Sequence, residues 1–251
     1  MEPADINTKS ASSWSARENI DLSQYLIDEA ILNLLTKGAA SKFCLLPLYL
    51  EGEVLHVAMA NPKDLPAIDE VRRIAKVRAI TPHAFSREDI LQAVDRNYGQ
   101  QHNVQDIVQE IQKEKFELGE VGSSAQKEDL MAMAEQAPII KLVNKIIYHA
   151  IQESASDIHF EQDENIFRVR FRQDGILQER YTFKRDLESA MLARVKITSG
   201  MDIAERRKPQ DGRMKIYLES KQIDVRVSSL PTLYGENIVL RLLDKTSVSN
   251  K

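Results

Sequence analysis

The chain has 251 residues, of which 43% are hydrophobic, 29% are charged and 6% are aromatic, and its formal net charge is -4. This length is comfortable for two domains, and the composition supports packed cores and excludes collagen-like and low-complexity chains. The small net charge gives no overall attraction to nucleic acid, so we expect no nucleic-acid partner. No apolar stretch approaches the roughly 20 residues of a membrane span, and the polar N-terminus differs from a secretory signal. We therefore expect a cytoplasmic protein.

The first part of the chain predicts a disordered N-terminus, residues 1–20, and then a small α/β domain, residues 21–99. A helix is predicted over residues 23–37, because apolar residues recur on one helical face and Gly38 follows them. The lone Cys44 cannot form an internal disulfide and is predicted to be a reduced core thiol.

Four further elements complete this domain in the prediction. The apolar stretches on either side of Glu51 and Gly52 predict a β-hairpin. A helix then starts after Asp64, whose side chain suits an N-cap. A strand follows, in which Pro82 marks the strand end or the sheet edge. The last helix begins at Ser86, with an acidic residue three positions later in capping-box spacing.

Residues 100–127 are polar and charged, their helical periodicity is weak, and they contain a Gly-Ser-Ser stretch. We interpret them as a flexible linker with some helical content. Residues 128–246 predict an α+β domain in which helices pack on a largely antiparallel sheet, and residues 247–251 form a tail. The fold class expected for the whole chain is therefore two small domains, one α/β and one α+β.

The second domain shows clear strand patterning. In "IFRVRFRQDG" the apolar residues face one way, and Arg168, Arg170 and Arg172 face the other. The "QDG" that ends this stretch predicts a hairpin turn. In the later motif "PQDGR", Pro209 and Gly212 predict another turn.

The octet "SASDIHFE" raises the question of a metal or acid/base site at Asp157 and His159. A zinc site needs three or four ligands, and the other histidines have no ligand spacing relative to His159. A serine hydrolase would need a nucleophile elbow of the G-x-S-x-G type, which the sequence lacks. We expect a structural turn instead, in which Asp157 bonds local backbone amides and His159 supports strand packing.

Four separated motifs carry a resemblance to a known family: "ASDIHFE", "RVRFRQDGIL", "DIAERRKPQDGR" and "IDVRVSSLPTLYGENIVLRLLD". Residues 137–245 closely resemble the region before the nucleotide-binding core of the secretion ATPases, the hexameric motors of type II secretion and type IV pilus assembly. Residues 22–99, with "LLPLYLEGEVLHVAMANPKDLPAIDEVRR", resemble the amino-terminal adaptor domain of the same family. The second domain is then expected to be the PAS-like α+β domain of these motors.

The resemblance implies a RecA-like domain with a Walker A loop, but the sequence contains no G-x-x-x-x-G-K-[ST] motif to hold the β- and γ-phosphates. We therefore interpret the chain as a fragment of the motor or as a natural truncated paralogue. ATP and magnesium are expected as cofactors in the full-length motor only. The chain alone is expected neither to bind ATP tightly nor to hydrolyse it.

Similarity to the family also implies that arginines of this domain contact the ATP phosphates in the assembled motor. Our first choice is Arg172, followed by Arg185 and Arg213. A guanidinium stays charged and binds phosphate through two hydrogen bonds, so it suits the charge that develops in phosphoryl transfer. The pattern alone favours another interpretation, in which Arg168, Arg170 and Arg172 form the solvated face of an amphipathic strand, and only the resemblance favours a phosphate contact for Arg172.

The leading functional interpretation is a motor module. The first domain would dock the ATPase onto an inner-membrane platform or cytoplasmic adaptor protein, and the second would contribute to a homo-hexamer and its nucleotide site, with the protein held at the membrane through partners. One alternative is a cyclic-dinucleotide sensor, although the "RLGxxL" repeat that some relatives use is absent. Another is a non-catalytic regulator that competes for motor subunits or for the platform.

Overall fold

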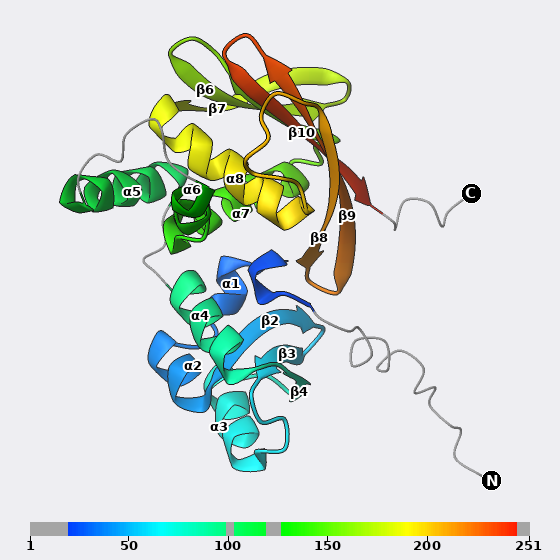
Figure 1. Cartoon of the computed structure of the whole chain (residues 1–251). Helices are drawn as coiled ribbons and strands as arrows, with labels where there is room; N and C mark the ends of the chain where they lie inside the picture. Colours follow the sequence, from blue (N-terminus) through cyan, green and yellow to red (C-terminus); the bar gives the residue numbers. More distant parts are fainter. Residues whose placement is uncertain (1–19, 99–102, 119–126, 245–251) are drawn as a thin grey trace. The chain divides into compact units, whose positions relative to one another are not determined.

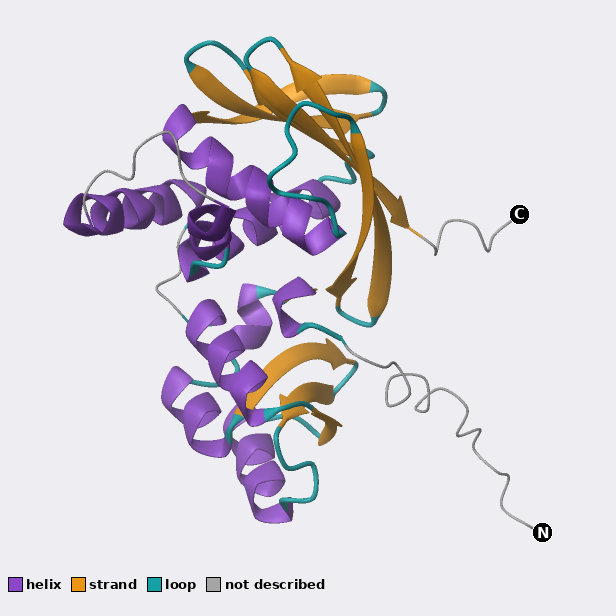
Figure 2. Ribbon diagram, in the orientation of Figure 1, coloured by secondary structure: helices purple, strands orange, loops and turns teal. Residues whose placement is uncertain are grey.

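The structure is a computed structural model that describes residues 20–98, 103–118 and 127–244. The predictions of a disordered stretch over residues 1–19, of flexibility in the Gly-Ser-Ser stretch and of a tail at 247–251 lie outside the described residues. The chain divides into two compact units, Met1–Tyr98 and Gly99–Lys251, called unit 1 and unit 2 below. Each unit combines helices with a sheet, as Figures 1 and 2 show, which confirms the predicted fold class.

Unit 1 contains short helices and a small sheet. Its elements are η1 (Leu22–Gln24), β1 (Tyr25–Leu26), α1 (Glu29–Leu32), α2 (Lys37–Phe43), β2 (Leu45–Glu51), β3 (Val54–Met59), α3 (Leu65–Ala75), β4 (Ala79–Ala84) and α4 (Arg87–Asn97). The order in the small sheet is β2-β3-β4, with β2 antiparallel and β4 parallel to β3. Because β4 lies at the edge of this sheet, it accommodates Pro82, which lacks a backbone donor.

Several local predictions for unit 1 are confirmed. Gly52 adopts a positive φ of 59° in the turn between β2 and β3, a conformation that costs glycine little. The Asp64 side chain accepts a hydrogen bond from the Ala67 amide and caps α3. Ser86 caps α4 in the same way through the Asp89 amide. Each such cap contributes about 1 kcal/mol to the helix that it begins.

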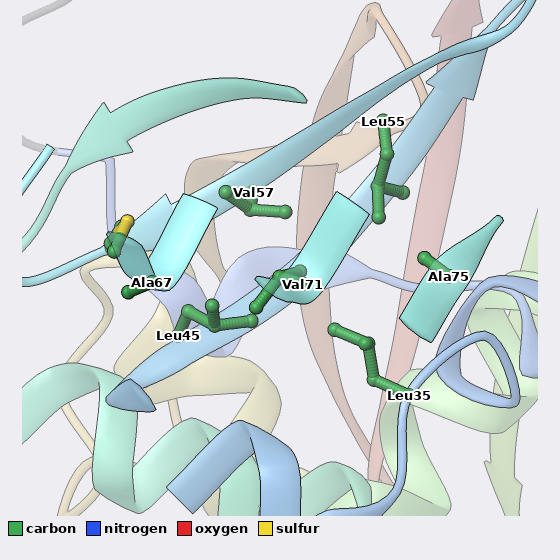
Figure 3. Close-up of a cluster of buried hydrophobic side chains, with 8 residues drawn as sticks. Leu35, Leu45, Leu55, Val57, Ala67, Val71 and Ala75 are labelled. Atoms are coloured by element: carbon green, nitrogen blue, oxygen red, sulfur yellow. The ribbon is translucent and has the colours of Figure 1, made fainter. Parts of the chain in front are cut away.

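The core of unit 1 lies between α3 and the strands β2 and β3 (Figure 3). Val71 of α3 is fully buried and packs in one cluster with Leu45, Leu55 and Val57 of the strands. Burying a side chain of this kind stabilises the fold by roughly 1.5–3 kcal/mol. The cluster therefore fixes the helix on the sheet and the sheet register with it.

The helix predicted over residues 23–37 is wrong. The structure has η1 and β1 there, a single helical turn in α1, and a new helix that begins at Lys37 and contains Gly38. Two side chains explain the interruption: Asp28 accepts a hydrogen bond from the Ala30 amide, and Thr36 accepts one from the Ala39 amide. Both residues therefore begin helices, and a continuous helix cannot contain two N-caps.

Unit 2 contains a larger sheet with helices on one of its faces (Figure 1). Its elements are α5 (Val104–Leu118), α6 (Lys127–Ala134), α7 (Ala137–Gln152), β5 (Asp157–Gln162), β6 (Ile166–Gln173), β7 (Ile176–Lys184), η2 (Arg185–Leu187), α8 (Glu188–Ser199), β8 (Gln210–Leu218), β9 (Lys221–Thr232) and β10 (Gly235–Asp244). Helix α5 occupies most of the segment that we interpreted as a linker, and it packs against α7. No helix in the described ranges is long and apolar enough to cross a membrane.

The strands of unit 2 run in the order β8-β9-β10-β5-β6-β7, and each neighbouring pair is antiparallel. One face of the sheet is apolar and buried, with Phe160, Phe171 and Leu240 fully inaccessible. Because side chains alternate along a strand, the residues between these positions lie on the opposite face, here called the outer face. The predicted hairpin turn at "QDG" is confirmed, since Asp174 and Gly175 have positive φ angles of 48° and 83°.

The turn predicted within "PQDGR" is wrong, because Gln210 already begins strand β8. Gly212 lies inside this strand opposite Val227. A Cβ atom at Gly212 would lie 2.5 Å from the carbonyl oxygen of Ser199. Glycine is therefore required here for the close approach of the strand to the end of α8.

Candidate functional site

The arginine-bearing strand β6 alternates as predicted. Phe167, Val169 and Phe171 are completely buried, and the intervening arginines lie on the outer face. Each of these arginine side chains is about one-third exposed. A guanidinium at this depth is partly shielded from water and still reaches the surface.

The register of five strands places four arginines and one carboxylate in a single line across the outer face. Arg172 of β6 pairs with Asp157 of β5, which pairs with Arg241 of β10; Arg241 pairs with Arg226 of β9, and Arg226 with Arg213 of β8. We call these five residues the arginine row. With strands about 4.8 Å apart, the row is about 19 Å long. The structure thus brings Arg172 and Arg213, two of the three arginines proposed from the sequence, into one line.

Asp157 is the only acidic member of the row, and it is buried, with 5% of its surface exposed. One carboxylate oxygen, Oδ1, lies 3.0 Å from Nε of Arg241, and the other, Oδ2, lies 3.3 Å from Nε of Arg172. Oδ2 also accepts a hydrogen bond of 2.8 Å from the Ser156 hydroxyl. Burial alone would raise the pKa of Asp157, but the hydrogen bonds from Arg241 and Ser156 outweigh it and hold the pKa below its ordinary value.

These contacts change the interpretation of the octet "SASDIHFE". The chain turns between α7 and β5, as predicted, with Ser154 at a positive φ of 55°. Asp157, however, binds two arginine side chains rather than backbone amides. Nδ1 of His159 lies 3.5 Å from Oε1 of Glu161, and burial lowers the pKa of His159. The described residues contain no group of three or more His, Cys, Asp or Glu side chains placed to hold a metal.

The neighbouring arginines of β6 differ from the row in their charge balance. Arg170 forms an ion pair with Glu161 at 2.5 Å, and Arg168 forms one with Asp163. Each of these arginines therefore has its own carboxylate. The row has one carboxylate for four arginines: Arg172 and Arg241 contact Asp157, and neither Arg213 nor Arg226 has an ion-pair partner among the described residues.

Arg185, the other arginine proposed from the sequence, lies outside the row. Its guanidinium donates to the Glu188 carboxylate at 3.1 Å, to the Glu164 carbonyl at 3.0 Å and to the Tyr234 carbonyl at 2.9 Å. Glu164 follows the end of β5, whereas Asp157 begins that strand, so Arg185 lies roughly 20 Å from the row. Its contacts tie η2 to two strand connections.

Sequence reasoning missed Arg226 and Arg241. Both lie in alternating strand patterns, "IDVRVSS" and "NIVLRLL", so their exposure on one face was a readable signal. Their place in the row was not readable, because it depends on the pairing of β10 with β5. The hydrogen bond between Arg241 and Asp157 joins residues 84 positions apart.

Comparison with known proteins returned two family matches that together include most of each unit. Residues 132–251 match the family model described as "Type II/IV secretion system protein", and residues 15–104 match the "MshEN domain". The type IV pilus assembly ATPase PilB of Myxococcus xanthus is 37% identical over an alignment of 235 residues that covers 91% of this chain and 40% of that protein. The type II secretion system protein E of Xanthomonas campestris pv. campestris is 38% identical over 207 residues, covering 82% of this chain and 35% of that protein.

The chain therefore spans 35–40% of the length of these curated relatives. Among solved structures, one described as "Structure of MshE with cdg" aligns with a TM-score of 0.29 and 25% identity, covering 32% of this chain and 57% of that one. Similarity at this TM-score supports no structural argument.

Proposed function

Because the chain belongs to the family of type II secretion and type IV pilus assembly ATPases and corresponds to their N-terminal region, we propose that it docks such a motor to its machine and supplies arginines to the nucleotide site. The motor is a homo-hexamer in this proposal. The nucleotide, ATP with Mg²⁺, is bound mainly by a RecA-like domain, and the protein works in the cytoplasm at the inner membrane.

The observation that carries the proposal for unit 2 is the arginine row. In phosphoryl transfer, negative charge spreads over the equatorial oxygens of the transferred group, and guanidinium groups from a neighbouring domain or subunit stabilise that charge. Arg172 and Arg213 are the residues that we propose for this contact, joined by Arg226 and Arg241 of the same row. Their shortage of carboxylates suits an anionic ligand, and their guanidinium groups fit phosphate oxygens.

Bound ATP supplies the phosphoryl group. The arginines of this chain place positive charge beside that phosphoryl group. The described residues include no cluster of potential metal ligands, so we assign the Mg²⁺ ligands to the RecA-like domain. Arg185 stays a prediction as a phosphate contact, since its three hydrogen bonds give it a bracing role within unit 2.

The test is ATP turnover by a motor in which this region is joined to a RecA-like domain. Arg172→Ala and Arg213→Ala should each lower the turnover number by about tenfold or more, because each removes charge stabilisation from the transition state. Arg168→Ala is the matched control, since Arg168 lies on the same strand and face but pairs with Asp163 outside the row. Equal turnover in all three variants would contradict the proposal.

For unit 1 we propose docking to an inner-membrane platform or cytoplasmic adaptor protein. Support comes from family membership and from the exposure of apolar side chains on this unit, Leu65 at 67% and Leu50 at 40%. Co-purification of the chain with membranes that contain the secretion or pilus machine tests this proposal. Leu65→Asp should reduce the bound fraction while the melting temperature stays constant, and equal binding to membranes without the machine would contradict it.

A further inference from the structure

The buried carboxylate of the arginine row has a geometry that simple charge balance does not require. Asp157 receives the Nε edges of two guanidinium groups from two different strands, at 3.0 Å from Arg241 and 3.3 Å from Arg172. A hydrogen bond from the Ser156 hydroxyl to Oδ2 fixes the orientation of the carboxylate itself. A carboxylate held in this way determines the direction in which each arginine extends from the sheet.

These contacts determine which edge of each guanidinium group remains available to a ligand. A guanidinium has a side edge, made of Nε and one terminal nitrogen, and an end edge, made of the two terminal nitrogens. Asp157 accepts a hydrogen bond from Nε of Arg241 and forms an ion pair with Nε of Arg172. Arg172 also donates from Nη1 to the Gly175 carbonyl at 2.9 Å. The terminal nitrogens of Arg241 have no hydrogen-bond partner in the described ranges, and two-thirds of its side chain is exposed.

We propose that Asp157 is a positioning residue, which holds the Nε atoms of Arg172 and Arg241 so that the end edge of Arg241 and one terminal nitrogen of Arg172 face a phosphate ligand. This inference rests on the proposed function of the row as a phosphate-binding site. It follows the general requirement that ligand-binding groups be held in place by a second layer of contacts.

Positioning and plain electrostatics predict opposite effects for the loss of this carboxylate. Removing a negative charge from the row raises its positive potential, which alone would strengthen the binding of an anion. Loss of orientation would weaken binding instead, because a mobile guanidinium must be ordered before it forms two hydrogen bonds. The sign of the change therefore separates the two explanations.

The experiment measures the affinity of the 251-residue chain for inorganic tripolyphosphate by isothermal titration calorimetry. We expect Asp157→Asn to bind on the order of fivefold more weakly than the wild type at the same salt concentration. The matched control is Asp211→Asn, which removes the same charge from the same outer face, where the Asp211 carboxylate accepts a hydrogen bond from Ser228 and has no ion pair with a described residue. This control should bind as tightly as the wild type or slightly more tightly. Equal or tighter binding by Asp157→Asn would overturn the inference.

A second readout follows the arginines directly. In nitrogen–proton NMR spectra, the Nε–H signals of Arg172 and Arg241 should be protected from exchange in the wild type and become like those of Arg213 and Arg226 in Asp157→Asn. Unchanged Nε–H signals would also overturn the inference. If thermal melting shows that Asp157→Asn does not fold, Arg241→Lys replaces it, since lysine keeps the charge but cannot present two fixed donors. Weaker binding by Arg241→Lys would support the inference, and unchanged binding would overturn it.

Failure of the proposed function gives a different pattern. If the wild-type chain does not bind tripolyphosphate, or if Arg213→Gln binds it as tightly as the wild type, the row is not a phosphate site and the inference falls with it. If Arg213→Gln weakens binding and Asp157→Asn does not, the row binds phosphate and only the positioning role of Asp157 is wrong.

Discussion

In both units, ionisable side chains lie next to one another on neighbouring strands. Those of unit 1 favour their neutral forms, whereas the arginines of unit 2 are charged. In unit 1, Tyr49, His56 and His83 stack across β2, β3 and β4, with ring centroids 4.2 Å and 5.3 Å apart, and Nδ1 of His56 lies 3.0 Å from Nε2 of His83. Burial lowers the pKa of both histidines and favours their neutral forms. In unit 2, the arginine row places four guanidinium groups, which keep their charge in proteins, beside one carboxylate.

The difference shows how the chemistry of a residue decides what a cross-strand row can do. Burial disfavours the protonated form of histidine, so a buried row of histidines is neutral and contributes to the fold by packing. An arginine does not lose its proton in proteins, so adjacent arginines repel each other unless a counter-ion is present. Part of the row lacks such a counter-ion within the described chain, which is why we assign it to an anionic ligand.

The largest expected effect is a loss of stability at a buried ion pair of unit 2, which contrasts with the arginine row of the same unit. Lys196 of α8 and Glu236 of β10 form an ion pair of 2.6 Å, and both side chains are almost completely inaccessible. Lys196→Met should lower the free energy of unfolding by about 3–5 kcal/mol, because it leaves an unpaired carboxylate in the interior.

Chemical denaturation of unit 2 measures this effect. The matched control is Lys37→Met in unit 1, which removes one partner of an exposed ion pair with Asp95. It should cost less than about 1 kcal/mol. Similar losses in the two variants would show that burial does not set the value of these pairs.

The next effect concerns the strand that carries Arg213. In Gly212→Val the new side chain would overlap with the Ser199 carbonyl oxygen, so β8 must move away from α8. We expect a loss of about 1–3 kcal/mol in unfolding free energy and weaker tripolyphosphate binding, since Arg213 moves with the strand. In Gly38→Ala in α2 the nearest atom to the new Cβ is Oγ1 of Thr36 at 4.0 Å, an ordinary contact, so the change should stabilise unit 1 by roughly 0.5–1 kcal/mol. A Gly212→Val variant as stable as the wild type would rule out the close approach.

A smaller effect tests the neutral state of the histidines in unit 1. Because burial lowers the pKa of His56 and His83 in the folded protein, the stabilisation that comes from their neutral forms is fully present above about pH 6.5 and is lost as the pH falls through the lowered values. Glu51, 3.4 Å from His56, acts in the opposite direction and limits the shift.

Native-state hydrogen exchange at the β3 amides measures this loss separately from unit 2, where His159 also has a lowered pKa. His83→Gln should flatten the pH dependence of exchange in β3. The same pH dependence in this variant as in the wild type would show that the histidine pair does not cause it.

The smallest stability effect is a gain. Arg226 faces Arg213 and Arg241 directly across the strands, and like charges in opposite positions destabilise a sheet. Arg226→Gln should therefore raise the unfolding free energy by about 0.3 kcal/mol, and high salt should remove the gain. Thermal unfolding at two salt concentrations checks this prediction, and a loss of stability at low salt would contradict it.

Local structure was largely predictable from the sequence, and the site was predictable only in part. The hairpin at Gly52, the caps at Asp64 and Ser86 and the alternation around Arg172 all depend on neighbouring residues, and all are confirmed. The helix predicted over residues 23–37 is wrong because Asp28 and Thr36 begin two separate helices, which the apolar spacing does not reveal.

The motifs also predicted the family, which the comparisons confirm. They did not predict the arginine row. Arg226 and Arg241 belong to it only because β10 pairs with β5 in one particular register. A single residue of slip would place both on the apolar face, and no local pattern reveals which strands meet. The role of Gly212 was misread for a similar reason, since its neighbour is the end of α8.

The most direct test of the account is the affinity of the chain for tripolyphosphate in the wild type and in Arg226→Gln, measured by isothermal titration calorimetry at low salt. If the arginine row is a phosphate site, the variant should bind on the order of fivefold more weakly while it unfolds at the same or a higher temperature. Equal affinity in the two proteins would contradict this prediction and would show that the arginines of the row are only the solvated face of the sheet.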